Sequence, residues 1–298
     1  MEYRNLGKTD LKVSRLGFGC MSLGTDQSEN ERLIHGALEA GVNFFDTADL
    51  YQKGWNEESL GKALKGQRHR AIIATKVGNQ WRADGSGWDW NPRKSYILAA
   101  VEDSLRRLQT DCIDLYQLHG GTIDDPIEEA IEAFEDLKTQ GKIRHYGISS
   151  IRPNVIRRWA GLSNMASVMM QYSLLDRRPE EVCLNFLHER KIGVIVRGAV
   201  AKGLLAGKPA RAWLTFSAEE VAAVQAVLSE LVHPDRSAAQ VAIQFVLAHA
   251  GVTTVALGIR TEAQLRDNLG VLSAPPLTTA EYEYLCESVP AARYTDHR

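Results

Sequence analysis

Two carboxylates, a threonine and a tyrosine lie within six positions in DTADLY, residues 46–51. They follow the apolar run at residues 42–45, which is typical of a buried strand. Two further apolar runs end at ionisable side chains, Lys76 in ATKVG and His119 in LYQLHGG. Neighbouring strands of a sheet lie about 4.8 Å apart, so these side chains are expected to meet Asp46 at one edge of a sheet.

This set of groups suits proton transfer. A free tyrosine has a pKa near 10, and a nearby Lys76 ammonium is expected to lower the pKa of Tyr51 by favouring the phenolate. Asp46 is expected to pair with Lys76, and His119 to hold a substrate oxygen or relay the proton. Such a phenol can protonate a carbonyl oxygen while another group attacks the carbon. Any one of these residues alone fits a structural role, but four at matching strand ends favour chemistry.

The elements that position these groups form eight similar units. Short apolar runs recur about every 30 residues, the size of a strand with its crossover helix. The segments between them carry helical stripes such as Ile127, Ala130, Phe134 and Leu137. The pattern predicts an α/β fold, a closed (β/α)8 TIM barrel, with an open doubly wound sheet as the alternative. The expected strands are residues 15–19, 42–46, 71–77, 112–119, 143–149, 167–171, 192–197 and 253–257.

Three segments lie outside the eight units. Residues 2–13 are expected to form an N-terminal β-hairpin in which Gly7 supplies the turn geometry. Residues 217–232 predict one additional helix, and the segment after Pro275 and Pro276 predicts another. No linker or low-complexity run divides the chain, so residues 1–298 are expected to form a single barrel domain.

Composition excludes several classes of protein. The formal net charge of -2 argues against a nucleic-acid binder. No apolar stretch is long enough for a membrane span, and the polar start lacks a signal core. The four cysteines are scattered and read as reduced thiols of a cytoplasmic protein. No metal-ligand spacing and no G-x-S-x-G elbow occur, so neither a metal site nor a serine hydrolase is expected.

The motifs, in their order and spacing, resemble the aldo-keto reductase superfamily over nearly the whole chain. LGKTDLKVSRLGFGCMSLG resembles the start of the family, and DTADLYQKGWNEESLGKAL resembles its tyrosine signature, with Glu58 and Gly61 at the family's positions. ATKVG and LYQLHGG are similar to its lysine and histidine strands. The resemblance implies a catalytic tetrad in which Tyr51 is general acid in reduction and general base in oxidation. The tetrad residues are Asp46, Tyr51, Lys76 and His119.

The resemblance also implies NADPH as the hydride donor. No G-x-G-x-x-G motif opens a helix, because Ser22 stands where the third glycine would fall, so a Rossmann site is not expected. A barrel can instead bind phosphate at its last loops and a helix N-terminus. In VALGIRTEAQLRDN the strand ends near Gly258, Ile259 and Arg260 follow, and a helix begins around Thr261.

Two interpretations of this last segment stay open. The resemblance implies that Arg260 binds the adenosine 2′-phosphate, while Gln264 and Asn268 meet the adenine. The two side chains are four residues apart and share a helical face. The alternative is structural, because Thr261 and Gln264 also fit a capping box and Arg260 fits a plain surface position.

Other strand ends extend the implied cofactor site. By resemblance, Ser149, Ser150 and Gln171 lie against the nicotinamide carboxamide, although the family usually has asparagine at the position of Ser150. GLLAGK resembles the pyrophosphate loop, with Leu205 and Lys208 nearest the phosphates.

One more position marks a branch of the family. Many members carry an aromatic residue at the position of Arg197, and this chain resembles the branch that has arginine there. The guanidinium plane of Arg197 can stack on the nicotinamide or approach the pyrophosphate. A solvent-facing arginine at a strand end is the structural alternative.

Candidate substrate contacts come from three loops at the rim. Met21 and Trp55 follow the first two strands, and Trp81 and Trp88 lie in a long loop at residues 78–92. Aromatic residues on such loops often line a binding cleft, though here they can also simply pack the loop onto the rim.

These observations predict an NADPH-dependent reductase of aldehydes or ketones. Small carbonyl compounds are its expected partners, and the family resemblance favours a monomer. One alternative is an NADPH-binding regulatory subunit with slow turnover, like the barrel-shaped β subunits of potassium channels in the same superfamily. The other is a hydrolase that uses Asp46 and Asp49 as a carboxylate pair.

Overall fold

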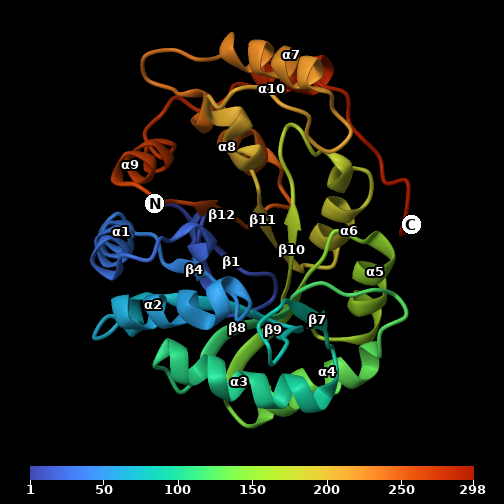
Figure 1. The fold of residues 1–298 in the computed structure, drawn as a ribbon. Helices are drawn as coiled ribbons and strands as arrows, with labels where there is room; N and C mark the ends of the chain where they lie inside the picture. The colour runs from blue at the N-terminus through green and yellow to red at the C-terminus, as the bar shows by residue number, and fades with distance from the viewer.

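The computed structural model describes residues 1–298, and its centre is a closed barrel of parallel strands (Figure 1). The strand order is β10-β11-β12-β3-β4-β5-β8-β9, so strands consecutive around the barrel are also consecutive along the chain. At least one helix lies in every connection, as parallel pairing requires. The expected (β/α)8 TIM barrel is confirmed. Its strands are β3 (Leu16–Gly19), β4 (Phe44–Asp46), β5 (Ile72–Val77), β8 (Ile113–Leu118), β9 (Ile143–Ser149), β10 (Ser167–Gln171), β11 (Gly193–Arg197) and β12 (Thr254–Gly258).

Helices cover the outside of the barrel because each carries one apolar stripe. In α3 (Lys94–Leu108), for example, Ile97, Val101, Leu105 and Leu108 are buried at helical spacing. The other surrounding helices are α1 (Gln27–Glu39), α2 (Trp55–Ala63), α4 (Ile127–Thr139), α5 (Pro153–Leu162), α6 (Cys183–Glu189), α8 (Ala238–Ala248) and α9 (Glu262–Gly270). Short 3-10 helices are η1 (Cys20–Ser22), η2 (Tyr51–Gly54), η3 (Arg68–Arg70), η4 (Arg178–Glu180) and η5 (Ala201–Ala206).

Both additional helices expected from the sequence are present. They are α7 (Ala218–Ser229), between β11 and β12, and α10 (Thr279–Ser288), near the C-terminus. Each begins with a capping box, formed by Ser217 with Glu220 and by Thr278 with Glu281. The two helices lie side by side beyond α8 (Figure 1). None of the helices is both long enough and apolar enough to span a lipid bilayer.

The N-terminal hairpin closes the end of the barrel at which the strands begin, opposite the candidate site. It consists of β1 (Tyr3–Asn5) and β2 (Lys12–Ser14), paired antiparallel as expected. Gly7 turns the chain with a φ of 62°, and a Cβ atom there would lie 2.7 Å from the carbonyl oxygen of Ala166. Only glycine therefore fits at this position, between the hairpin and the amino-terminal ends of the barrel strands.

The barrel interior is layered, and this layering places the candidate site. Successive residues of a strand point alternately inward and outward. Phe44, Ala74 and Leu115 belong to a small interior cluster together with residues of β10, β11 and β12. Residues two positions further along these strands also point inward, one layer nearer the carboxyl ends. On β4, β5, β8, β10, β11 and β12 they are Asp46, Lys76, Gln117, Gln171, Arg197 and Gly258.

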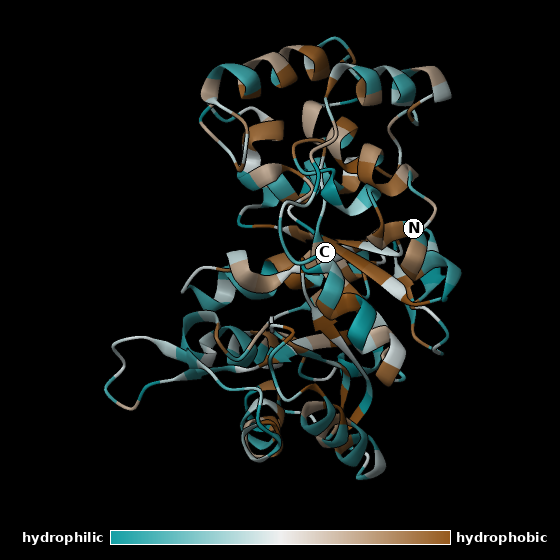
Figure 2. Cartoon of the chain, turned by 90° about the vertical axis from the view of Figure 1, so that its right-hand side faces the viewer, coloured by the Kyte–Doolittle hydropathy of each residue, from teal (hydrophilic) through white to brown (hydrophobic).

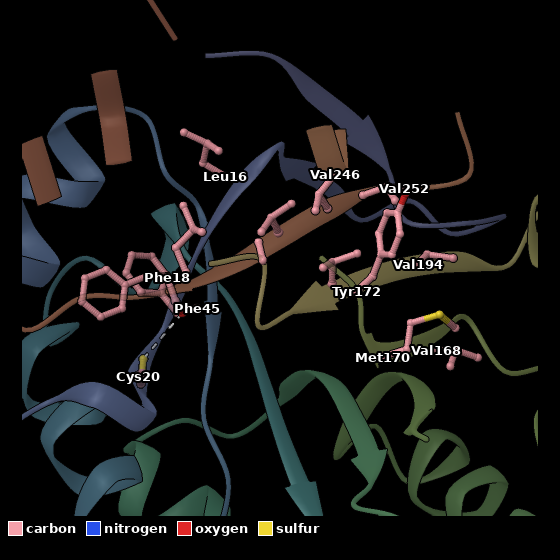
Figure 3. Packing of buried hydrophobic residues seen from close by; sticks show 14 of the residues in the cluster. Leu16, Phe18, Cys20, Phe45, Val168, Met170, Tyr172, Val194, Val246 and Val252 are labelled. Carbon is pink, nitrogen blue, oxygen red and sulfur yellow. Dashed lines mark hydrogen bonds between the residues drawn. The ribbon is translucent and has the colours of Figure 1, made fainter. Parts of the chain in front are cut away.

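Most of the apolar core lies between the barrel and its helices. This outer cluster holds 67 buried residues against 10 in the interior cluster, so barrel–helix packing contributes most of the hydrophobic stabilisation. Phe18 stacks on Phe45 with ring centroids 5.8 Å apart, and Met170 and Tyr172 lie in another part of the cluster (Figure 3). Apolar residues concentrate at the centre of the molecule and polar ones on its periphery (Figure 2).

The segment expected as a plain loop at residues 78–92 is instead mostly a hairpin. Its strands β6 (Asn79–Trp81) and β7 (Trp88–Trp90) pair antiparallel. Gly85 turns the chain with a φ of 70°, and Arg82 holds Asp89 across the hairpin at 2.6 Å. Tryptophan favours strands, and a turn that contains Asp84 and Gly85 joins the two runs.

Candidate active site

Lys76 is the centre of a buried hydrogen-bonded cluster at the carboxyl ends of β4 and β5. Its Nζ atom donates to Oδ2 of Asp46 at 2.8 Å and to the carbonyl oxygen of Thr47 at 2.7 Å. It also lies 3.4 Å from Oη of Tyr51. Lys76 is fully buried. The contact between the phenol and the ammonium expected from the sequence is therefore present.

His119 completes the group of four residues. Its ring packs edge-on against the ring of Tyr51, with centroids 5.7 Å apart. The Nδ1 atom of His119 is buried and has no hydrogen-bond partner. The structure thus brings together the four residues that the sequence singled out at the ends of three strands.

Electrostatics fix the charge of the lysine and the imidazole. Burial acts to lower the pKa of Lys76, but Asp46 and Tyr51 outweigh it and raise that pKa above its usual value. Burial raises the pKa of Asp46, against the opposing effect of Lys76. The 2.8 Å contact between them fits an ion pair. Burial, with the charges of Lys76 and Arg197, lowers the pKa of His119 to about 3, so the imidazole is neutral at pH 7.

The pKa of the phenol differs from expectation. Lys76 does act to lower the pKa of Tyr51, as the sequence suggested. Burial has the larger effect, and the pKa of Tyr51 lies above its usual value of 10.0. The expectation of a lowered pKa is therefore wrong. The sequence places a lysine beside the phenol but does not reveal how completely the two are removed from water.

The loop that carries Tyr51 has an unusual backbone. Gln52, Lys53 and Gly54 follow Tyr51 with φ values of 51°, 56° and 88°, three left-handed residues in succession. Left-handed non-glycine residues are strained by about 1 kcal/mol or more each and persist only where surrounding contacts impose them. Arg107 supplies such a contact, because a Cβ atom at Gly54 would lie 2.7 Å from its side chain.

An ion pair with the buried Glu57 holds the partly buried Arg107 in that place. Its Nη2 atom lies 2.6 Å from Oε2 of Glu57, whose Oε1 accepts a 2.6 Å hydrogen bond from the hydroxyl of Thr75. Glu57 is fully buried. Glu58, the acid singled out in the sequence, instead pairs with Lys62 at the surface. Neither Glu57 nor Arg107 was predicted from the sequence, because nothing along the chain distinguishes the buried Glu57 from the exposed Glu58 beside it.

Asp49 lies in the same neighbourhood as Glu57. Burial and the nearby Glu57 raise the pKa of Asp49 to about 8. Asp46, by contrast, forms an ion pair with Lys76. The two aspartates are therefore in unlike environments, and nothing in their arrangement favours the alternative of a hydrolytic carboxylate pair.

The residues expected near the nicotinamide lie on the next strands of the barrel. Oε1 of Gln171 accepts a hydrogen bond of 2.9 Å from Arg197, and its Nε2 donates to Asp176 at 2.8 Å. Ser149 is buried at the end of β9. The hydroxyl of Ser150 accepts from the backbone N–H of Arg152, so it serves the local turn. Arg197 lies exposed at the rim.

The predicted pyrophosphate loop forms η5. Leu205 is buried in the outer core, so its side chain packs and does not face the rim. The side chain of Lys208 is exposed and donates to the carbonyl oxygen of Lys202 at 3.0 Å. Of these two residues, only Lys208 presents a charged group to solvent.

Both interpretations of residues 258–268 find support in the structure. Thr261 caps α9, and Oε1 of Gln264 accepts from the backbone N–H of Arg260 at 2.9 Å, which is a capping arrangement. The guanidinium of Arg260 is exposed and has no carboxylate within ion-pair distance, at the positive end of the α9 dipole. Ile259 is buried, and Asn268 lines a small crevice with apolar residues of β3 and α9.

The four predicted substrate contacts lie on loops at the carboxyl end of the barrel, with different exposure. Met21 and Trp88 are the most exposed, at 63% and 47%. Trp55 and Trp81 are half-buried, each with a lysine ammonium 5.1 Å from its ring centroid, and their indole N–H groups have no partner. Trp90 instead donates to Asp125 at 3.0 Å and packs on the barrel rim.

Known proteins resemble this chain over its whole length. It is 48% identical, over all of both sequences, to the uncharacterized oxidoreductase YqkF of Bacillus subtilis. It is 34% identical to the aldo-keto reductase YhdN of the same organism, over 74% of this chain and 68% of that one.

Solved structures agree with these relatives. The holo form of aldo-keto reductase AKR11C1 from Bacillus halodurans matches with a TM-score of 0.94 and 51% identity, over 100% of this chain and 99% of that one. The glycerol dehydrogenase AKR11B4 from Gluconobacter oxydans matches with a TM-score of 0.84 and 27% identity, over 96% and 94%. The model of the aldo/keto reductase family matches residues 15–289. The chain belongs to the aldo/keto reductase family and is an oxidoreductase of the kind that uses a nicotinamide cofactor.

Proposed function

We propose that this protein reduces aldehydes or ketones to alcohols with NADPH, and that Tyr51 donates the proton to the carbonyl oxygen. The observation that supports this most strongly is the buried contact of Tyr51 with the Lys76–Asp46 ion pair. When bound, NADPH supplies the hydride that reaches the carbonyl carbon. Everything else in the reaction is a matter of holding the substrate and moving one proton.

The proton movement follows from the charges of the site. The raised pKa of Tyr51 keeps the proton on the phenol at neutral pH, so the side chain is protonated before the substrate binds. As the proton leaves, the ammonium of Lys76 at 3.4 Å stabilises the phenolate. Asp46 keeps that ammonium charged and in place. The carbonyl oxygen gains electron density as the carbonyl carbon is reduced, so proton transfer from Tyr51 to this oxygen becomes favourable only as the reaction proceeds.

His119 has a second role in this proposal. Its imidazole is neutral, because burial and nearby positive charges lower its pKa to about 3. A neutral imidazole can donate a hydrogen bond to the carbonyl oxygen without competing as an acid. The edge-on packing against Tyr51 places it beside the phenol, where it can orient the oxygen that receives the proton.

The cofactor end of the proposal rests on the fit of this chain to a phosphate-bearing dinucleotide. Arg260 is exposed and unpaired at the N-terminus of α9, where both its charge and the helix dipole favour a phosphate. In this proposal Arg260 binds the 2′-phosphate, Gln264 and Asn268 bind the adenine, and Lys208 lies near the pyrophosphate. Gln171 and Ser149 would then orient the nicotinamide, with Arg197 beside it.

The wider setting of the enzyme is also part of the proposal. We propose that residues 1–298 act as one domain and as a monomer. The four cysteines are all unpaired, which suits a reducing cytoplasm. The alternative of a slow regulatory subunit gains no support from the site, where the four tetrad side chains are all present and in contact.

Consumption of NADPH by the purified protein tests this function. An aldehyde, a ketone and a sugar are each supplied with NADPH and, separately, with NADH. Turnover of at least one carbonyl compound with NADPH, and a higher KM for NADH than for NADPH, are the expected results. An enzyme that binds NADPH but turns over none of the carbonyl compounds would overturn the proposal in favour of the regulatory alternative.

A further inference from the structure

Gln117 lies inside the barrel at the level of the candidate catalytic lysine. It precedes His119 by two positions in LYQLH, and in the pairing of β5 with β8 it stands opposite Lys76. The side chain is fully buried. Its neighbours one layer below, Leu115 and Ala74, are apolar interior residues, so Gln117 marks the start of the polar layer.

The side-chain amide of Gln117 forms no hydrogen bond in the structure. Neither its Nε2 nor its Oε1 atom has a hydrogen-bond partner, although both are buried. A buried amide without partners costs about 1–3 kcal/mol, so such a residue in a barrel interior calls for an explanation. Asp46 presents the complementary problem, because its Oδ1 atom is also buried and unpartnered.

Lys76 cannot supply the missing partner. An ammonium has three N–H donors, and those of Lys76 are directed to Asp46, Thr47 and Tyr51. The Oδ1 atom of Asp46 needs a donor, because a carboxylate oxygen can only accept, and the amide of Gln117 has an unused donor. The Gln117 amide is close enough to be among the groups that hold down the pKa of Asp46 against burial.

We propose that Gln117 is a positioning residue for the reaction described above: its amide N–H holds Oδ1 of Asp46, so that Oδ2 stays on Lys76. The inference rests on the proposed function for the meaning of the ion pair. A carboxylate fixed through both oxygens cannot rotate, and the ammonium then stays aimed at Tyr51. Gln117 itself is fully buried and forms no hydrogen bond with Tyr51 or His119, so it acts through Asp46.

Two substitutions at this position separate positioning from simple packing. Gln117→Met keeps the length and volume of the side chain but removes the donor. Loss of a hydrogen bond to a charged group is expected to lower kcat roughly tenfold to a hundredfold, with KM nearly unchanged. Without the donor the pKa of Asp46 rises, so the acidic limb of the kcat–pH profile moves to higher pH and the loss is greatest at low pH.

Gln117→Glu is expected to show the opposite trend with pH. A protonated carboxyl can donate to Asp46 as the amide does, whereas an ionised one repels it. Activity relative to the wild type should therefore be highest at low pH and fall as pH rises. Leu115→Met, one layer below on the same strand, is the matched control for disturbance of the barrel interior and should leave the pH profile in place.

The outcomes distinguish this inference from the function on which it rests. If the two Gln117 variants lose activity equally at every pH, or lose none, the positioning role is wrong even though the wild type reduces carbonyl compounds. If the wild type itself reduces none, the proposed function fails. Circular dichroism and Tm of each variant show whether it is folded. If Gln117→Met does not fold, Gln117→Glu alone tests the inference, through the fall of its relative activity as pH rises.

Discussion

The two ends of the candidate site are built in opposite ways. At the tetrad end, Lys76 is fully buried and each of its N–H donors has a protein partner. At the α9 end, Arg260 is exposed and has no ion-pair partner, while Gln264 caps the helix beside it. The lysine of the first end has all its hydrogen-bond partners within the protein, whereas the arginine of the second end presents a charged group that a ligand can engage.

This difference has a consequence for any test by mutation. A buried, fully bonded group contributes to the fold as well as to the proposed proton transfer, so its loss is expected to affect stability and kcat together. An exposed, unpaired group contributes little to the fold, and its loss is expected to appear in the KM of the cofactor alone.

Lys76→Met should have the largest effect. It leaves the carboxylate of Asp46 buried without its partner, which is expected to lower the free energy of unfolding by about 3–5 kcal/mol. Turnover should fall roughly 10³- to 10⁴-fold because the phenolate loses its counter-charge. Urea unfolding and steady-state kinetics measure the two effects. Lys62→Met, at the surface of α2, is the control, and equal behaviour of both variants would contradict the comparison.

Glu57→Gln should affect stability nearly as much. The change leaves the partly buried Arg107 without its ion pair and frees the strained loop after Tyr51, at an expected loss of about 3 kcal/mol in the free energy of unfolding. kcat should fall as well, since Tyr51 is less well held. Glu58→Gln is a matched control one residue away, and its exposed pair with Lys62 contributes little. Similar unfolding midpoints for the two variants would show that the buried pair does not hold the loop.

His119 should make stability depend on pH at the buried end. Its pKa is lowered to about 3 in the folded protein, against 6.5 for the free residue, so protons bind preferentially to the unfolded chain between these values. Its contribution to stability is complete above pH 6.5 and is lost as pH falls towards 3, by up to about 1.4 kcal/mol per pH unit. The difference in the free energy of urea unfolding between the wild type and His119→Asn should therefore become smaller as the pH is lowered from 6.5 towards 3.

The control for this pH dependence of stability is His69→Asn, at an exposed position of η3. A wild-type minus His119→Asn difference that stays constant from pH 7 to pH 4 would show that the imidazole is not held neutral.

Arg260→Ala should have the smallest effect on the protein and a selective effect on the cofactor. Loss of one charged hydrogen-bonding group is expected to raise the KM for NADPH roughly tenfold or more, with little change in the KM for NADH, in kcat or in Tm. Arg266→Ala, on the same helix but paired with Glu262, is the control. An equal rise in KM for both cofactors would place Arg260 away from the 2′-phosphate.

Much of the architecture could be predicted because it follows from patterns along the chain. The eight apolar runs lie within two residues of the observed strands, and the hairpin and both additional helices are where the sequence predicted them. The hairpin of β6 and β7 is not evident from the sequence, because each of its strands has only three residues, too few for a clear alternation of apolar and polar side chains.

The site was predictable only where single strand ends carry distinctive groups. Asp46, Lys76 and His119 mark such ends, and barrel closure brings them together. Glu57 and Gln117 could not be separated from surface residues by sequence alone, because burial depends on which neighbours pack on them. The raised pKa of Tyr51 was missed for the same reason, since burial outweighs the charge of Lys76.

The most direct test of the account is one substitution that removes only the phenolic hydroxyl, Tyr51→Phe. NADPH binding, followed by the quenching of tryptophan fluorescence, should keep its wild-type Kd. Turnover of the best carbonyl substrate should fall roughly 10²- to 10⁴-fold, because the proton donor is gone while the ring shape remains. A Tyr51→Phe protein that reduces the substrate at the wild-type rate would contradict the central claim that this tyrosine supplies the proton.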